Sequence, residues 1–342
     1  MPVIKKITKR SGGGLAPIRV GEDCAGLMGA SVALRKLGLG DRIKHVYTSE
    51  SCQKVRRVMK LNWKELGPIG KDIMRRSPLE KCDVYSCGFP CQGFSSKDKR
   101  LGMFDPSGRG LIGMAACKAI ADSLPKAFIL ENVGSFGDAR YKQFRDGMLT
   151  ALRNICDANG HIMYDVRTRK LNSRFHGVPQ NRERYYIVGT ANKYTRLTGI
   201  QFQWPMDLPC AGDLEDFLDP RPSGRNLDHD ICIPTGKVAQ ANLLQAVLDL
   251  TKRKEAPLEN PWVAEIFGGR GPRVKYNYSP CLTSERCRIG GHYLLGRGRL
   301  MSTAEMLRLQ GHGIATSAGG HGPSYVLCVH CCVLFLESRS GR

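Results

Sequence analysis

Apolar and polar positions follow a pattern along the chain that predicts strands and helices in turn. Short apolar runs bounded by glycine or polar residues predict strands at 18–23, 44–50, 83–88, 127–133 and 184–190. Longer segments with helical periodicity predict helices at 29–39, 52–62, 111–124 and 141–160, the last ending at Gly160. Strands that alternate with helices predict an α/β fold with a mostly parallel sheet covered on both faces.

The pattern changes after residue 190, which suggests two domains or one large domain with an insertion. Residues 191–278 are rich in Pro, Gly, Asp and Arg and weakly periodic, as expected of a separate loop-rich unit. The regular pattern of apolar and polar positions returns over 279–312, where Ser302 and Glu305 have the spacing of a capped helix start. Residues 1–16 are expected to form a flexible basic leader.

The charge balance is strongly basic, with 52 Lys and Arg against 31 Asp and Glu and a net charge of +21. This favours a polyanionic partner, most often nucleic acid, over the alternative that charge only keeps the protein soluble.

Fourteen cysteines are scattered along the chain, and its first residues lack the apolar core of a secretory signal, so we expect reduced intracellular thiols. Cys328 and Cys331 form the one C-x-x-C pair, without a second pair to complete a zinc site, so no metal is expected. The longest apolar run, 326–336, is too short to cross a bilayer, so no membrane partner is expected.

The segment "EDCAGLMGAS" (22–31) joins a strand to a helix through glycines. Such turns bring backbone amides close to a nucleotide-like ligand at the carboxyl edge of a sheet, although many are only turns. Glu50 ends the next strand, where a carboxylate suits the two hydroxyls of a ribose. Asp72 is a candidate for contact with a base amino group, or else a helix cap.

The segment "CGFPCQGFSSKDKR" (87–100) places Cys91 between Pro90 and a loop rich in glycine and lysine. The nearby cations favour the thiolate and attract phosphate, although a loop cysteine is often incidental. Glu131 and Asn132 end a neighbouring predicted strand, so an acid and a nucleophile are expected at one edge of the sheet. The alternative is that Glu131 only caps a helix.

Arg182 and Arg184 alternate on the approach to another strand and are expected to point to one face. Paired arginines suit a phosphate or a carbonyl oxygen, and a solvated basic edge is the alternative.

Taken together, these motifs resemble those of the DNA cytosine C5-methyltransferases. "GFPCQGFS" resembles that family's nucleophile motif, "LENV" its glutamate motif, "QNRER" its arginine motif and "EDCAGLMG" its cofactor loop. "PCLTSERCRIGGHYLL" with "EMLRLQG" is similar to its penultimate motif, and the order fits over residues 18–312. The resemblance implies a Rossmann-like S-adenosylmethionine-dependent methyltransferase sheet with a small loop-rich target recognition domain.

The resemblance also implies domains and site residues. Residues 17–190 and 279–313 would form the catalytic domain, 191–278 the target recognition domain and 314–342 a divergent tail. Catalytic residues would be Cys91, Pro90, Glu131, Asn132, Arg182 and Arg184. The S-adenosylmethionine pocket would use Cys24, Ala25, Gly26, Leu27, Glu50, Ser51, Asp72 and Ile73.

A mechanism follows from the resemblance. Cys91 would add to C6 of a cytosine flipped out of double-stranded DNA, Glu131 would act at N3, and C5 would then take the methyl group before Cys91 leaves. The protein would be a monomer, with targeting proteins as a further class of partner. It would be nuclear if eukaryotic and cytoplasmic otherwise.

The sequence departs from the family at three places. Cys24 stands where phenylalanine is usual and Met28 where glycine is usual. The usual closing motif contains asparagine, and this chain has none after Asn277, so the methionine end of the cofactor is expected to lack support. The recognition region is short. A tRNA cytosine C5-methyltransferase and a non-catalytic relative that keeps the fold are therefore the alternative readings.

Overall fold

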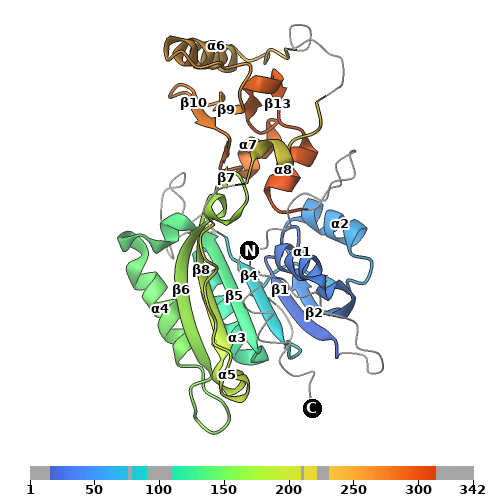
Figure 1. The fold of residues 1–342 in the computed structure, drawn as a ribbon. Coiled ribbons are helices and arrows are strands. Elements are labelled where there is room, and N and C mark those ends of the chain that lie inside the picture. The colour runs from blue at the N-terminus through green and yellow to red at the C-terminus, as the bar shows by residue number, and fades with distance from the viewer. Residues whose placement is uncertain (1–15, 76–78, 91–108, 209–211, 222–230, 313–342) are drawn as a thin grey trace.

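The computed structural model describes residues 16–75, 79–90, 109–208, 212–221 and 231–312. These residues form a large sheet with helices on both faces and a smaller unit beyond one edge of that sheet (Figure 1). The large sheet has seven strands in the order β3-β2-β1-β4-β5-β8-β6. Its strands are β1 (Ile18–Asp23), β2 (Ile43–Ser49), β3 (Ile69–Gly70), β4 (Val84–Gly88), β5 (Ala127–Val133), β6 (Tyr164–Asn172) and β8 (Glu183–Ala191).

All neighbours in this sheet are parallel except those of β8, which runs antiparallel to both β5 and β6. The α/β fold with a mostly parallel sheet is thus confirmed. The reversal matters for position, because it brings the beginning of β8 to the edge where the parallel strands end. Arg184 therefore pairs in register with Val133, the last residue of β5.

Alternation along the strands divides the core between the two faces of the sheet. Tyr85, Cys87, Phe128 and Leu130 pack on one face, in a cluster that includes apolar residues of α3 and α4. Val84, Ala127 and Ile129 pack on the opposite face, with Leu34 of α1. The helices are α1 (Gly29–Leu34), α2 (Gln53–Asn62), α3 (Ile112–Ser123), α4 (Lys142–Arg153), α5 (Asn192–Thr198), α6 (Lys237–Lys252), α7 (Ser284–Arg288) and α8 (Thr303–Leu309).

The expected helix over 141–160 is wrong at its end, because α4 stops at Arg153. Asp157 Oδ1 accepts hydrogen bonds from the backbone N–H groups of Asn159 and His161, at 2.9 and 3.0 Å. Such side-chain bonds offer the backbone a turn in place of a helix. The chain then enters β6, a charged edge strand that the apolar pattern did not predict.

The smaller unit contains a four-stranded sheet in the order β10-β9-β12-β13. Its strands are β9 (Trp262–Glu265), β10 (Arg273–Tyr276), β12 (Tyr293–Leu294) and β13 (Arg299–Leu300). Residues 191–278, expected to be rich in loops, also contain α6, whose Ala246 and Leu250 pack in one cluster with Ala264 and Tyr293. This sheet includes strands on both sides of the expected boundary at 278 and 279, so the division into domains stays a prediction.

Two elements join the units. β7 (Gln180–Asn181) pairs in parallel with β11 (Ser279–Pro280), and Gln180 Nε2 donates to the Leu309 carbonyl at 3.2 Å. The capped start of α8 is confirmed, since Ser302 Oγ accepts from Glu305 N at 3.1 Å and a Glu305 carboxylate oxygen accepts from Ser302 N at 2.7 Å. Within the described residues, no helix is long and apolar enough to cross a membrane.

Packing between β5 and β8 yields a stability prediction. A Cβ added at Gly189 would lie 2.1 Å from Cε1 of the fully buried Phe128. We expect Gly189→Ala to lower the free energy of unfolding by about 1–3 kcal/mol, the usual cost of overpacking. Gly147, on an open side of α4 with nothing within 4 Å of an added Cβ, is the matched control. Gly147→Ala should raise the free energy of unfolding by about 0.5–1 kcal/mol in urea titrations. Equal effects of both substitutions would contradict the packing.

Candidate active site

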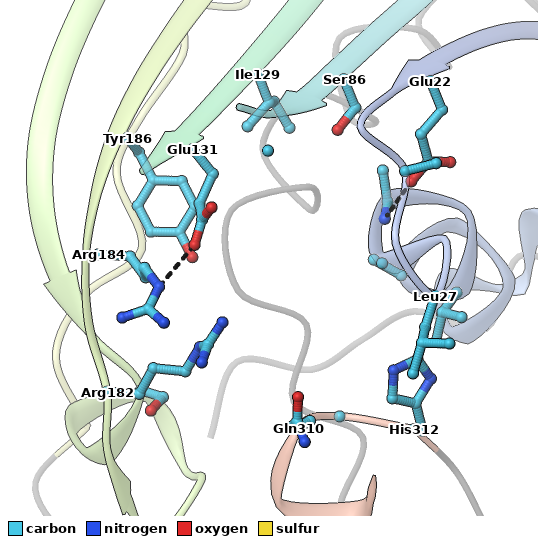
Figure 2. A pocket seen from close by; sticks show the side chains of 18 of the residues that line it. Glu22, Leu27, Ser86, Ile129, Glu131, Arg182, Arg184, Tyr186, Gln310 and His312 are labelled. Carbon is cyan, nitrogen blue, oxygen red and sulfur yellow. Dashed lines mark hydrogen bonds and ion pairs between the residues drawn. The ribbon is translucent and has the colours of Figure 1, made fainter. Parts of the chain in front are cut away.

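Two adjoining cavities lie at the edge where the parallel strands end. The first, of about 610 Å³, lies beside the ends of β2, β4 and β5, and we name it the strand-end cavity. The second, of about 440 Å³, lies between α1 and the β5–β8 pair, and we name it the α1 cavity (Figure 2). Both have a shared wall formed by Cys24, Gly88, Glu131, Arg182 and Arg184.

The residues expected to bind the cofactor come from three loops and lie around these cavities. The loops follow β1, β2 and β3. Cys24, Glu50, Ser51, Asp72 and Ile73 line the strand-end cavity, and Ala25 and Leu27 line the α1 cavity.

Gly26 does not line either cavity, but its backbone N–H donates to Glu50 Oε2 at 3.0 Å. The other oxygen of Glu50 accepts from the backbone N–H of Cys52 at 2.8 Å. This carboxylate therefore ties the first loop to the second. A carboxylate has about four acceptor positions, so two remain for a ligand's hydroxyl groups.

Glu131 and Arg184 form an ion pair in the shared wall, with Nε of Arg184 2.8 Å from Oε1 of Glu131. The two residues lie diagonally on adjacent antiparallel strands, so their side chains leave the sheet on the same face. Figure 2 shows both side chains on one side of the α1 cavity, opposite Glu22 and Leu27. Burial lowers the pKa of Arg184 and the Glu131 carboxylate raises it; the net direction is upward, so the guanidinium stays charged.

Asn132, in β5, holds the segment that directly follows β4. It is buried, and its Nδ2 donates to the Phe89 carbonyl at 3.1 Å. Pro90 follows and lines the strand-end cavity. Cys91, the expected nucleophile, lies outside the described residues, so its place relative to Glu131 stays a prediction.

Arg182 also lines both cavities, but its side-chain hydrogen bonds run toward the smaller unit. Its Nη1 donates to the Leu282 carbonyl at 3.5 Å and contacts Cys281 Sγ at 3.9 Å. Arg184 Nη2 lies 4.0 Å from the same sulfur. Cys281 thus connects the two arginines, a role that the motif "PCLT" did not reveal because it depends on the pairing of β7 with β11.

Two buried acids at the end of β1 were also missed. Asp23 accepts hydrogen bonds from Ser49 Oγ at 2.6 Å and from the Tyr85 hydroxyl at 2.8 Å. Glu22 accepts from Ser31 Oγ at 2.8 Å and from the Ala30 backbone at 3.3 Å, which fixes the first turn of α1. The sequence signal that could have found these two residues is a pair of consecutive acids at the end of an apolar strand. Within the described part of the chain, no cluster of His, Cys, Asp and Glu could hold a metal.

The burial of Glu22 predicts a dependence of stability on pH. Burial raises the pKa of its carboxyl from 4.5 to about 7. Between these values the folded protein binds more protons than the unfolded chain, so this group's contribution to stability is lost as pH rises through the interval. Glu22→Gln removes the cost of the charge. The free energy of unfolding of the variant minus that of the wild type should increase by up to about 3 kcal/mol from below pH 4.5 to above pH 7.

Urea titrations across this pH range measure that difference. Glu65→Gln, at a half-exposed side chain paired with Arg35 on the surface, is the control and should give a difference that hardly varies. A flat difference for Glu22→Gln as well would show that the carboxyl is not held as described.

Comparison with known proteins identifies the family of the chain. Residues 18–313 match the model of the family described as C-5 cytosine-specific DNA methylase. The chain is 31% identical over 292 residues to the type II methyltransferase M.NgoBI of Neisseria gonorrhoeae, covering 84% of this chain and 80% of that protein. It is 30% identical over 292 residues, with the same coverage, to the type II methyltransferase M.HaeII of Haemophilus aegyptius.

Solved structures show the same fold. The Entamoeba histolytica methyltransferase EhMeth aligns with a TM-score of 0.54 at 13% identity, covering 94% of this chain and 96% of that one. A variant of Spodoptera frugiperda DNMT2 aligns with a TM-score of 0.54 at 15% identity, covering 93% and 94%. The matched family model spans both cavities and most of the chain, so this chain belongs to the C-5 cytosine-specific DNA methylase family.

Proposed function

We propose that this DNA cytosine-5 methyltransferase uses Cys91, Glu131 and Arg184 to activate a flipped-out cytosine, with S-adenosylmethionine held by the three loops around the strand-end cavity. The observation that carries the proposal is the Glu131–Arg184 ion pair in the wall of a cavity that Pro90 also lines. Pro90 is the covalent neighbour of Cys91.

The strand-end cavity fits the cofactor that the family uses. Its volume of about 610 Å³ lies within the usual range for ligand sites, about 300–1,000 Å³. Glu50 offers two remaining acceptor positions beside the first loop, and Asp72 and Ile73 lie on the same wall. When bound, S-adenosylmethionine supplies a methyl group on a positively charged sulfur. Cys24 offers a smaller surface than the phenylalanine usual at that position.

The chain's own residues supply the activation of the base. C5 of cytosine is a weak nucleophile, and addition of the Cys91 thiolate to C6 makes C5 resemble the carbon of an enamine. Negative charge then develops toward N3, where Glu131 would protonate or hydrogen-bond the ring nitrogen and so lower the cost of addition. Arg184 fixes the Glu131 side chain and faces the O2 side of the base.

The remaining residues position these groups. Asn132 donates to the Phe89 carbonyl and so fixes the residue before Pro90. Arg182 donates to the Leu282 carbonyl and so fixes the chain at that residue. After methyl transfer a base removes the C5 proton, and Cys91 leaves as the C5–C6 double bond returns. A cytosine within a duplex must first leave the stack, at a cost of a few kcal/mol. The net charge of +21 supports DNA as the partner that provides this energy through phosphate contacts.

The mechanism predicts a covalent trap. Duplex DNA that carries 5-fluorocytosine cannot lose its C5 substituent, so with labelled S-adenosylmethionine it should remain attached to Cys91. Cys91→Ser should abolish the attachment while DNA binding persists in a gel-shift assay. Glu131→Gln should lower kcat on ordinary duplex DNA by about 100-fold or more, because general acid catalysis contributes about that much.

Parallel reactions separate the alternatives. Label on tRNA alone would assign the chain to RNA methylation. Absence of label from both substrates, with DNA binding intact, would favour a non-catalytic relative. Normal turnover by Cys91→Ser would overturn the mechanism.

The cofactor assignment predicts a selective loss of affinity. Glu50→Gln keeps the size of the side chain but replaces one acceptor oxygen by a donor, so hydrogen bonds to ligand hydroxyls and to Gly26 or Cys52 weaken. We expect the dissociation constant for S-adenosylmethionine, measured by calorimetry, to rise about tenfold. Glu65→Gln, on the surface, should bind like the wild type. Unchanged affinity of Glu50→Gln would remove Glu50 from the cofactor site.

A further inference from the structure

Two cysteine side chains lie together where the cavities adjoin. Cys24 follows β1 directly, is half-buried and lines both cavities. Cys87 lies in β4 and is 1% exposed. Asp23 pairs in register with Cys87 in the parallel β1–β4 ladder, which places Cys24 one residue beyond that pair. Cys24 also packs against the core cluster that contains Cys87. The two cysteines are thus neighbours from adjacent strands.

The register of β1 with β4 places the two side chains next to each other. This contact with Cys24, followed by burial, raises the pKa of Cys87 well above its ordinary value. The free Cys87 thiol therefore keeps its proton. Of the two, Cys24 is the thiol that a molecule in either cavity reaches first, and Cys87 stands behind it.

The backbone holds Cys24 in this place. Its φ is 48°, in the left-handed region that a non-glycine residue rarely adopts. The next residue is fixed by a hydrogen bond from Ala25 N to the Ser49 carbonyl at 3.0 Å, and Met28 N donates to the Ala25 carbonyl at 2.7 Å. A turn held at both sides keeps the Cys24 side chain beside Cys87.

We propose that Cys24 is a modification site for small disulfides such as glutathione disulfide, with Cys87 as its resolving thiol, and that modification closes the cofactor cavity. The part that concerns the cofactor rests on the proposed function. The pairing of the two thiols does not.

The chemistry consists of two exchanges. The Cys24 thiolate attacks one sulfur of glutathione disulfide, a new S–S bond forms, the old one breaks, and glutathione leaves as a thiolate that takes up a proton. Cys87 then attacks Cys24 Sγ, the S–S bond to glutathione breaks, and the proton of Cys87 passes to the glutathione thiolate as it leaves. In sum, two protein thiols are oxidised to one disulfide and glutathione disulfide is reduced to two thiols.

The two products have different consequences for the cavity. The mixed disulfide places a tripeptide in the space that Glu50 and Asp72 also line, so it excludes a nucleoside ligand. The internal disulfide removes the tripeptide and draws Cys24 toward β4. Modification therefore blocks the cavity until Cys87 or a reductant clears it.

The experiment uses the full chain with Cys91→Ser throughout, because Cys91 is itself expected to react and the readouts need no turnover. Protein is treated with glutathione disulfide, then alkylated, digested with trypsin and analysed by mass spectrometry. The tryptic peptide 20–35 contains Cys24, and the peptide 82–97 contains Cys82 and Cys87. We expect these two peptides to be joined, with the bond located at Cys87 by fragmentation.

Three variants sharpen the result. Cys87→Ser should stop the reaction at the mixed disulfide on Cys24, and the dissociation constant for S-adenosylmethionine should then rise at least tenfold and recover with dithiothreitol. Cys24→Ala should prevent both products. Cys82→Ser is the matched control, since Cys82 is equally buried in the same peptide but contacts Ser123 and Tyr47, and it should react like its parent.

The outcomes are distinct. Linked peptides in the parent protein, together with lost binding by glutathionylated Cys87→Ser, support the whole proposal. Linked peptides in a protein that does not bind S-adenosylmethionine even before treatment support the thiol pair and contradict the proposed function. The inference is overturned if the two peptides stay unlinked after treatment of a protein that binds S-adenosylmethionine normally. It is also overturned if glutathionylated Cys87→Ser still binds S-adenosylmethionine fully.

Discussion

The site depends on one ion pair, between Glu131 at the end of β5 and Arg184 at the beginning of β8. The pair exists because β8 runs against its neighbours. In a fully parallel sheet the beginning of that strand would lie at the opposite edge, and the guanidinium could not reach the carboxylate. Arg184 is largely buried, so loss of either partner would leave a charge poorly solvated. Such losses typically cost about 3–5 kcal/mol. The same contact fixes the fold of the edge and orients the acid that we propose acts on the base.

Buried polar groups organise the rest of the edge. Glu22, Asp23 and Asn132 each direct hydrogen bonds to a strand end or a loop rather than to solvent. Because a buried polar group without a partner is costly, each fixes its hydrogen-bond partner in one arrangement. Glu50 does the same for two loops at once and still retains acceptor capacity. A ligand therefore meets a wall whose polar atoms are already held in place.

The smaller unit contributes to this wall through few contacts. β7 with β11 and the Gln180–Leu309 hydrogen bond bring Leu282 to Arg182 and the end of α8 to the α1 cavity. The start of α8 is itself tied to the unit, since Arg299 pairs with Glu305 and Ser302 Oγ donates to Asp219 Oδ2 at 2.8 Å. Contacts of this kind couple the part of the chain expected to read DNA to the residues expected to act on it.

The thiol pair adds a second property to the same edge. Cys24 stands where the family usually has an aromatic residue, and Cys87 lies on the next strand, in register with Asp23. A substitution that weakens contact with a nucleoside thus also places a reactive group beside it. Whether the cavity accepts its ligand then depends on the oxidation of one sulfur atom as well as on shape.

The sequence by itself determined the alternation of strands and helices, the capped start of α8 and the residue types at each strand end. These follow from local periodicity and capping, which act over a few neighbouring residues. Only the tertiary structure decided that β6 forms a charged edge strand, that β8 is reversed, that Arg182 contacts Leu282 while Arg184 pairs with Glu131, and that Cys24 meets Cys87. Each of these contacts joins segments distant in sequence or depends on strand direction, and the strand order of a sheet is set by the burial of both its faces rather than by the pattern within any one strand.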